Sequence, residues 1–133
     1  MPGGSTGTVL VADDEPMLLR LVDNVLRRAG FRVVTAATGT EALEAFSEDP
    51  AAIDTVLIDA GVSPSGAAQV LRSMLALASG VGVIVSSGAS PSDELRELLA
   101  DCGGRFLGKP FEPQTLISVV SAMGRALDRQ SGD

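Results

Sequence analysis

The sequence predicts an α/β protein organised around a parallel β-sheet, and three observations support this prediction. Five short runs of apolar and β-branched residues recur along the chain at regular intervals. Each run is followed by a stretch with the periodicity of an amphipathic helix. The chain has 133 residues, which is enough for one domain with a substantial core. The expected strands cover residues 8–12, 32–36, 54–59, 81–86 and 104–107.

The first three expected helices each have a recognisable end or start and one apolar face. The first covers residues 15–29 and is stopped by Gly30. The second opens with the capping-box pattern of residues 38–41, and the third covers residues 65–77. The faces expected to point into the core consist of Leu18, Leu21, Val22, Val25, Leu26 and Ala29 in the first helix, Ala42, Leu43 and Phe46 in the second, and Val70, Leu71, Met74 and Leu75 in the third.

The fourth helix is expected to begin with Ser90 as its N-cap, Pro91 at the first helical position and Asp93 in the first turn. The fifth covers residues 113–127. Residues 1–7 and 129–133 lie outside the pattern and are expected to be tails or linker remnants, so the domain covers residues 8–128. The inward positions are Leu95, Leu98 and Leu99 in the fourth helix, and Leu116, Val119, Val120, Met123 and Leu127 in the fifth.

The composition excludes several classes of protein. Hydrophobic residues make up 45% of the chain, but Trp and Tyr are absent and only four Phe occur, so the core must be aliphatic. No apolar run approaches the ~20 residues of a membrane span. The first residues also lack the features of a signal peptide, so we expect a soluble cytoplasmic protein without membrane attachment. A net charge of −7 argues against direct binding of nucleic acid by this domain.

The absence of histidine limits the chemistry further. The chain cannot carry a phosphohistidine, a Ser-His-Asp triad or an imidazole metal ligand. Its single cysteine, Cys102, excludes an internal disulfide and a cysteine-based zinc site, and we expect it to be a small packing residue. Any phosphoryl chemistry must therefore use carboxylates, together with a hard cation such as Mg²⁺.

Charged residues end three of the expected strands. Asp13 and Asp14 follow the first strand, Asp59 ends the third, and Lys109 follows the fifth. Because parallel strands end at one edge of a sheet, these side chains should meet in one crevice, where the flexible side chain of Lys109 is suited to pairing with Asp59. Two carboxylates about 4 Å apart repel by roughly 4 kcal/mol at an effective dielectric of about 20, and a divalent cation would remove that repulsion. Taken singly, each acid could be an ordinary helix cap and the lysine a solvated loop residue.

The chain resembles a response-regulator receiver domain of two-component signalling, over about residues 7–128. Four segments carry the resemblance, namely residues 9–16, 57–59, 83–88 and 106–111. The resemblance implies a flavodoxin-like fold, which is a doubly wound (βα)5 parallel sheet with strand order 2-1-3-4-5.

The resemblance also implies a role for each acid. Asp59 would be the phosphoacceptor, taking a phosphoryl group from a partner's phosphohistidine. Asp13 and Asp14 would bind Mg²⁺ together with Asp59, and Asp14 is favoured as a direct ligand. The backbone carbonyl of Gly61 would complete the protein's share of the metal site.

Three further positions match the family. By resemblance, Ser87 would grip the transferred phosphoryl group, Lys109 would stabilise its charge, and Phe106 would be the switch aromatic that moves inward as Ser87 shifts. The plainer alternatives are a strand-end hydroxyl that satisfies backbone groups for Ser87 and ordinary core packing for Phe106. The expected output is a change on the face formed by the fourth helix, fifth strand and fifth helix.

The loop after Asp59 departs from the family's pattern. Pro64 lies five residues beyond the acid (64 − 59) and Gly66 seven (66 − 59), whereas the family usually has its glycine eight residues beyond. The loop is therefore expected to be remodelled and one residue short, which affects the predicted role of Gly61 most. It motivates an alternative function, a degenerate receiver used only for docking or dimerisation without phosphorylation.

Two functions from other classes fit less well. A phosphatase with an aspartyl nucleophile would need its acceptor acid after the first strand and a second acid two residues later in an apolar spacer pattern, whereas Asp13 is followed directly by Asp14 and Glu15 without such a spacer. A flavin-binding module would need a hydroxyl-rich phosphate loop after that strand. We therefore expect a phosphoacceptor rather than an enzyme. The implied partner is a histidine kinase or a histidine phosphotransfer domain, the resemblance also allows a weak homodimer, and an origin in a hybrid histidine kinase is slightly favoured.

Overall fold

The computed structural model describes the backbone of residues 7–132 and the side chains of residues 7–123, and it contains one parallel sheet flanked by helices. The sheet has the order β2-β1-β3-β4-β5, and every neighbouring pair is parallel, which confirms the predicted topology. The elements are β1 (Thr8–Ala12), α1 (Pro16–Arg28), β2 (Arg32–Ala36), α2 (Gly39–Glu48), a 3-10 turn (Pro50–Ala52), β3 (Thr55–Asp59), α3 (Ala67–Leu77), β4 (Gly82–Ser87), α4 (Asp93–Cys102), β5 (Arg105–Gly108) and α5 (Pro113–Gly132).

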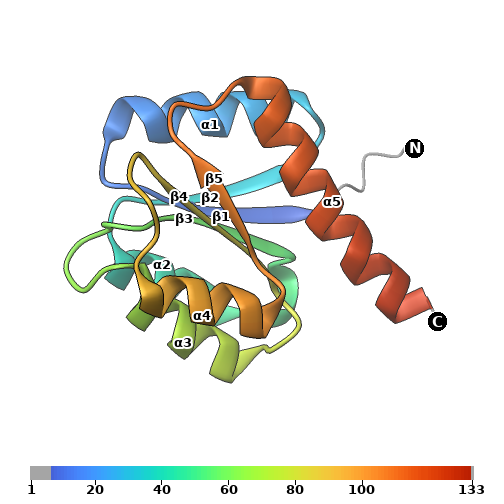
Figure 1. Cartoon of the computed structure of the whole chain (residues 1–133). Helices are drawn as coiled ribbons and strands as arrows, with labels where there is room; N and C mark the ends of the chain where they lie inside the picture. Colours follow the sequence, from blue (N-terminus) through green and yellow to red (C-terminus); the bar gives the residue numbers. More distant parts are fainter. Residues whose placement is uncertain (1–6, 133) are drawn as a thin grey trace.

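The helices form two layers around the sheet. Helices α1 and α5 cover one face, and α2, α3 and α4 cover the other (Figure 1). Side chains alternate along the central strands to serve both layers. In β1, Val9 and Val11 pack with residues of α1 and α5, whereas Leu10 and Ala12 pack with residues of α2, α3 and α4. Both faces of the central strands are thus buried, as expected for a parallel sheet.

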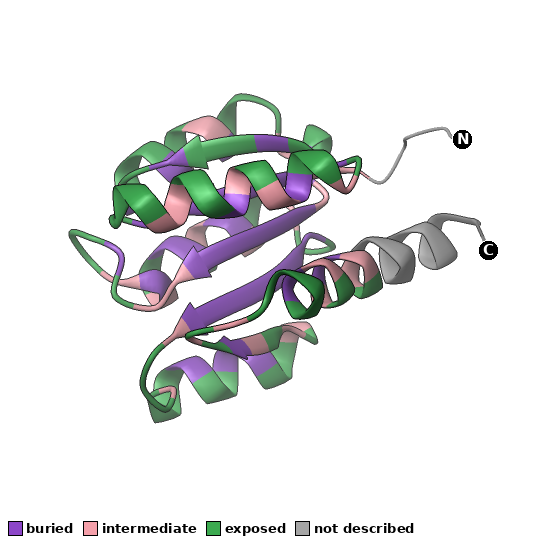
Figure 2. Cartoon of the chain, turned by 90° about the horizontal axis from the view of Figure 1, so that it is seen from above, coloured by how far each residue is buried: buried purple, intermediate pink, exposed green. Residues whose placement is uncertain are grey.

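The core is aliphatic, as the composition predicted, with Phe31 and Phe46 as its buried aromatic side chains in the described part of the chain. Buried residues concentrate in the central strands and on the inner sides of the helices (Figure 2). Burial raises the pKa of the Cys102 thiol, whose Sγ lies 3.8 Å from the Leu99 carbonyl oxygen. This is consistent with a packing role for Cys102.

One predicted core position is wrong. Leu21 was placed on the inner face of the first helix, but its side chain is 52% exposed. Val22 and Leu26 are buried as predicted, because they point at the sheet from the centre of the apolar stripe. Leu21 lies at the edge of that stripe, on a side of the helix that faces solvent. The predicted inward position of Leu127 lies outside the side chains that the structure describes.

Two helix starts show how local hydrogen bonds set the element boundaries. At α2, the Thr38 hydroxyl accepts a hydrogen bond from the Glu41 amide at 3.1 Å, which confirms the predicted cap. At α4, the predicted cap Ser90 is wrong, since Ser92 caps the helix by accepting from the Leu95 amide at 3.2 Å. Pro91 therefore precedes the helix instead of opening it.

The ends of the chain differ from the expected limits in one respect. The last helix continues to Gly132, beyond Leu127, where its apolar pattern was expected to end. The expected N-terminal tail lies outside the described residues except for Gly7. Within the described residues, no helix combines the length and apolarity needed to cross a bilayer.

Candidate functional site

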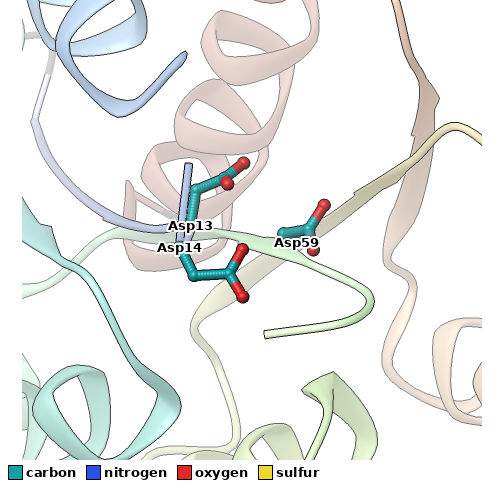
Figure 3. A group of neighbouring side chains, drawn as sticks. All are labelled: Asp13, Asp14 and Asp59. Atoms are coloured by element: carbon teal, nitrogen blue, oxygen red, sulfur yellow. The ribbon is translucent and has the colours of Figure 1, made fainter. Parts of the chain in front are cut away.

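Three acids meet at the carboxyl ends of β1 and β3. Asp13 and Asp14 directly follow β1, and Asp59 is the last residue of β3. The two strands are neighbours in the sheet, with Ala12 opposite Ile58. One carboxylate oxygen from each acid lies within 4.8 Å of the others, and Figure 3 shows the three side chains gathered at this edge. The predicted convergence of the acids is therefore present in the structure.

Lys109 joins this group from the end of β5. Its Nζ atom donates to Asp59 Oδ1 at 2.6 Å and to Asp13 Oδ2 at 3.0 Å. It also lies 3.6 Å from the Glu15 carboxylate. The pairing with Asp59 was expected from the sequence, whereas the contacts with Asp13 and Glu15 were not. A single ammonium group therefore neutralises part of the charge of three carboxylates.

Burial and charge act in opposite directions on Asp13 and Lys109. Burial raises the pKa of Asp13, although hydrogen bonds from the Glu15 amide and from Lys109 counteract part of the effect. Burial alone would lower the pKa of Lys109, but its hydrogen bonds to Asp59 and Asp13, together with their charges, raise it instead. Lys109 is thus held firmly in its charged form, while Asp13 carries a negative charge at some cost.

The acids differ in how accessible they are. Asp13 is buried, the Asp59 side chain is 16% exposed, and Asp14 is exposed. A cation or phosphoryl group that arrives from solvent would therefore reach the carboxylate of Asp14 and the exposed part of the Asp59 side chain first. Carboxylate oxygens at this spacing are the ligands that a small divalent cation such as Mg²⁺ prefers. The donor set fits such an ion, which would also relieve the repulsion among the acids.

Two contacts in the loop between β3 and α3 were missed by the sequence analysis. The Gly61 amide donates to Asp59 Oδ2 at 3.0 Å. The Ser63 hydroxyl lies 3.1 Å from Asp14 Oδ2 and donates to it. The displaced proline at position 64 was the available signal that this loop takes its own path. The predicted role of the Gly61 carbonyl stays a prediction, since the contact seen here is made by the amide.

Ser87 and Phe106 lie near the same edge of the sheet. Ser87 is the last residue of β4, and its hydroxyl accepts a hydrogen bond from the Ala89 amide at 3.1 Å. Phe106 lies in β5, is partly buried and packs against the core cluster on the side of α2, α3 and α4. Both contacts match the plainer alternatives for these residues, so their roles in phosphoryl binding and switching stay predictions.

Replacing Asp13 with asparagine is expected to stabilise the fold in Mg²⁺-free buffer by about 1 kcal/mol, because it removes a charge that is desolvated by burial and that also repels Asp59. The folded-state pKa of Asp13 is raised, so ionised Asp13 costs stability above that pKa, and the cost shrinks as the pH falls from that pKa to the ordinary pKa of aspartate. The gain should therefore be present at pH 7 and shrink in acid. Urea unfolding followed by circular dichroism, at pH 7 and in acidic buffer, measures the difference in unfolding free energy between Asp13→Asn and wild type. A gain in stability that is the same under both conditions would contradict this explanation.

Comparison with known proteins places the chain in a family. The model of the response regulator receiver domain matches residues 9–121. The transcriptional regulatory protein KdpE of Mycobacterium tuberculosis is 34% identical over 117 residues, which cover 88% of this chain and 50% of that protein. The sensor kinase CckA of Brucella abortus is 30% identical over 118 residues, covering 89% of this chain and 12% of that protein.

A solved structure shows the same fold. The CheY-like receiver domain protein from Methanospirillum hungatei JF-1 matches with a TM-score of 0.85 at 21% identity, covering 93% of this chain and 98% of that one. The chain spans about half the length of the curated regulators that it matches first. The match of the family model over most of the chain, together with this fold, shows that the chain belongs to the response regulator receiver domain family of two-component signalling.

Proposed function

We propose that this domain accepts a phosphoryl group on Asp59 from the phosphohistidine of a histidine kinase or a histidine phosphotransfer domain, in a Mg²⁺-dependent reaction. The observation that carries the proposal is the position of Asp59. Its carboxylate accepts a hydrogen bond from the ammonium of Lys109 and lies within 4.8 Å of the acidic pair, at the edge where a parallel sheet binds ligands. The donor imidazole must come from a partner, because this chain contains no histidine.

The residues around Asp59 would act by positioning and charge, as in other phosphoryl transfers. A P–N bond in the donor breaks while a P–O bond to Asp59 forms, and the bonding electron pair returns to the imidazole. The Gly61 amide donates to one Asp59 carboxylate oxygen and Lys109 donates to the other. Asp13 and Asp14 would hold the cation, which supplies positive charge beside the phosphoryl oxygens.

After transfer, Lys109 and Ser87 would share the new charge. To reach the phosphoryl group, the Ser87 hydroxyl would have to leave the Ala89 amide. We propose that this shift draws Phe106 inward and changes the surface formed by α4, β5 and α5, which partners would then read. The domain would serve as a cytoplasmic signalling module and not as an enzyme in the ordinary sense. The similarity to KdpE and to CckA, a sensor kinase that is also described as a hybrid histidine kinase, supports two contexts, a transcriptional regulator and a hybrid histidine kinase.

A degenerate receiver that docks without being phosphorylated is the second candidate, and the remodelled loop between Asp59 and α3 favours it. Titration with beryllofluoride and Mg²⁺, followed by backbone NMR, separates the two. A phosphoacceptor is expected to show saturable shifts around Asp59, Ser87 and Lys109 that require both additives. Spectra that do not respond would support the degenerate receiver. Tryptophan and tyrosine are absent, so the usual fluorescence readout cannot be applied.

A further inference from the structure

We propose that Ser63 is a positioning residue that holds Asp14 ready to bind the divalent cation. The inference rests on the proposed function and concerns a contact made by the remodelled loop. The Ser63 hydroxyl donates to Asp14 Oδ2 at 3.1 Å, across 49 positions in the sequence. It links the loop after β3 to the acid after β1, which are the two segments that build the metal site.

Asp14 needs such support more than its neighbour does. The Asp13 carboxylate is buried and held by the Glu15 amide at 2.9 Å and by Lys109 at 3.0 Å. Asp14 is exposed, and within the described residues the Ser63 hydroxyl is the hydrogen-bond donor found on its carboxylate. Without that contact, rotation of the side chain would carry the Asp14 carboxylate away from Asp13 and Asp59 into solvent.

The backbone of the loop fixes the place of Ser63. Its carbonyl oxygen accepts a hydrogen bond from the Gly39 amide at 2.6 Å, at the first residue of α2. The preceding residue, Val62, is fully buried and its amide donates to the Asp59 carbonyl oxygen at 3.1 Å. Ser63 is therefore anchored on α2 through its backbone and on β3 through its neighbour.

The close approach of α2 depends on the glycine at position 39. A Cβ atom there would lie 2.8 Å from Val70 Cγ2 and 3.2 Å from the Ser63 carbonyl oxygen. The absence of a side chain lets the loop and the start of α2 touch. The Ser63 hydroxyl is thus presented from a supported backbone, although its side chain lies on an exposed loop.

The chemistry of the contact suits a metal site. A hydroxyl donates one hydrogen bond to a carboxylate and leaves the charge and the remaining lone pairs of that carboxylate available to a cation. Groups that orient metal ligands in this way typically contribute 10- to 100-fold in metal affinity. The contact of Ser63 is exposed to solvent, so we expect a smaller effect of about three- to tenfold.

The test is a Mg²⁺ titration of the unphosphorylated protein, followed by backbone NMR, with no phosphodonor present. Ser63→Ala is expected to bind Mg²⁺ about three- to tenfold more weakly than wild type. Ser63→Thr keeps a hydroxyl and should bind like wild type. Ser65→Ala is the matched control, because it removes a hydroxyl from the same loop and should leave the affinity unchanged. Circular dichroism verifies that each variant is folded.

The outcomes separate this inference from the proposed function. Equal Mg²⁺ affinities for wild type and Ser63→Ala would overturn the role of Ser63 and leave the phosphoacceptor proposal standing. Equal weakening in Ser63→Ala and Ser63→Thr would also overturn it, since the hydroxyl would then not be the group that matters. A wild-type protein without saturable Mg²⁺ binding would remove both the Ser63 inference and the Mg²⁺-dependent reaction.

Discussion

Replacing Asp59 with asparagine is expected to abolish phosphoryl uptake, because the amide has no carboxylate oxygen that can form the acyl phosphate. Wild type should gain up to one phosphoryl group per chain when it is incubated with Mg²⁺ and a small phosphodonor, and Asp59→Asn should gain none. The asparagine can still accept a hydrogen bond from Lys109 through its side-chain oxygen, so the variant should remain folded. Intact-protein mass spectrometry measures the stoichiometry directly.

Asp54 provides the matched control for this experiment. It precedes the same strand, but at the opposite edge of the sheet, where its carboxylate accepts a hydrogen bond from the Thr8 amide at 2.8 Å. Asp54→Asn retains an acceptor oxygen and should be phosphorylated as wild type is. Phosphorylation of Asp59→Asn at the wild-type level would show that another residue is the acceptor, and loss of phosphorylation in both variants would point to a general effect on the fold.

The convergence of the acids could be predicted because it follows from topology. Once the alternation of strands and helices indicated a parallel sheet, every strand had to end at the same edge. Asp13, Asp14, Asp59 and Lys109 each lie at or directly after a strand end, so their meeting did not depend on side-chain detail. The strand boundaries were accurate to one residue, since runs of β-branched and apolar residues define buried strands well.

The contacts that could not be predicted depend on the paths of loops and on the edges of helices. The hydrogen bond between Ser63 and Asp14 requires the loop after β3 to rest on the start of α2. Periodicity does not encode such a path. In the same way, Leu21 belongs to the apolar stripe of α1 by its spacing, but the width of the covered surface decides that it is exposed. Two nearby serines, Ser90 and Ser92, both suit the N-cap of α4, and periodicity does not decide that Ser92 is the one used.

The electrostatic balance of the site depends on side-chain reach, which explains why only part of it was anticipated. Lysine was expected to pair with Asp59, since both groups lie at strand ends. Its long and flexible stem also lets it cover Asp13, which is buried, and approach Glu15, which begins the turn into α1. In this structure the ammonium group of Lys109 thus partly neutralises the charges of several carboxylates at once.

Replacing Lys109 with methionine should therefore destabilise the fold in Mg²⁺-free buffer, by about 2 kcal/mol. Removing one partner from a buried pair usually costs about 3–5 kcal/mol, and the 17% exposure of the Lys109 side chain reduces that cost. Methionine keeps a long unbranched side chain, so packing is largely preserved. Arg72→Met is the control, because Arg72 and Glu94 form a pair that is more than half exposed and should contribute less than about 1 kcal/mol.

The pH dependence of the stability loss in Lys109→Met tests whether the charge of Lys109 causes that loss. The folded-state pKa of Lys109 is raised, so its contribution is fully present below the ordinary pKa of lysine and is lost as the pH rises through the folded-state value. The difference in unfolding free energy between wild type and Lys109→Met should therefore be constant near neutral pH and narrow in strongly alkaline buffer. Urea unfolding followed by circular dichroism measures it.

Mg²⁺ should reverse part of the loss in Lys109→Met. Removing the ammonium leaves more negative charge for the cation to neutralise, so Mg²⁺ should stabilise the variant more than it stabilises wild type. Comparing the free energy of unfolding with and without Mg²⁺ gives this difference. Equal stabilisation of the two proteins would mean that Lys109 and the cation do not act on the same carboxylates. That outcome would show that Lys109 acts independently of the proposed metal site, although its Nζ atom lies 2.6 Å from Asp59 in this structure.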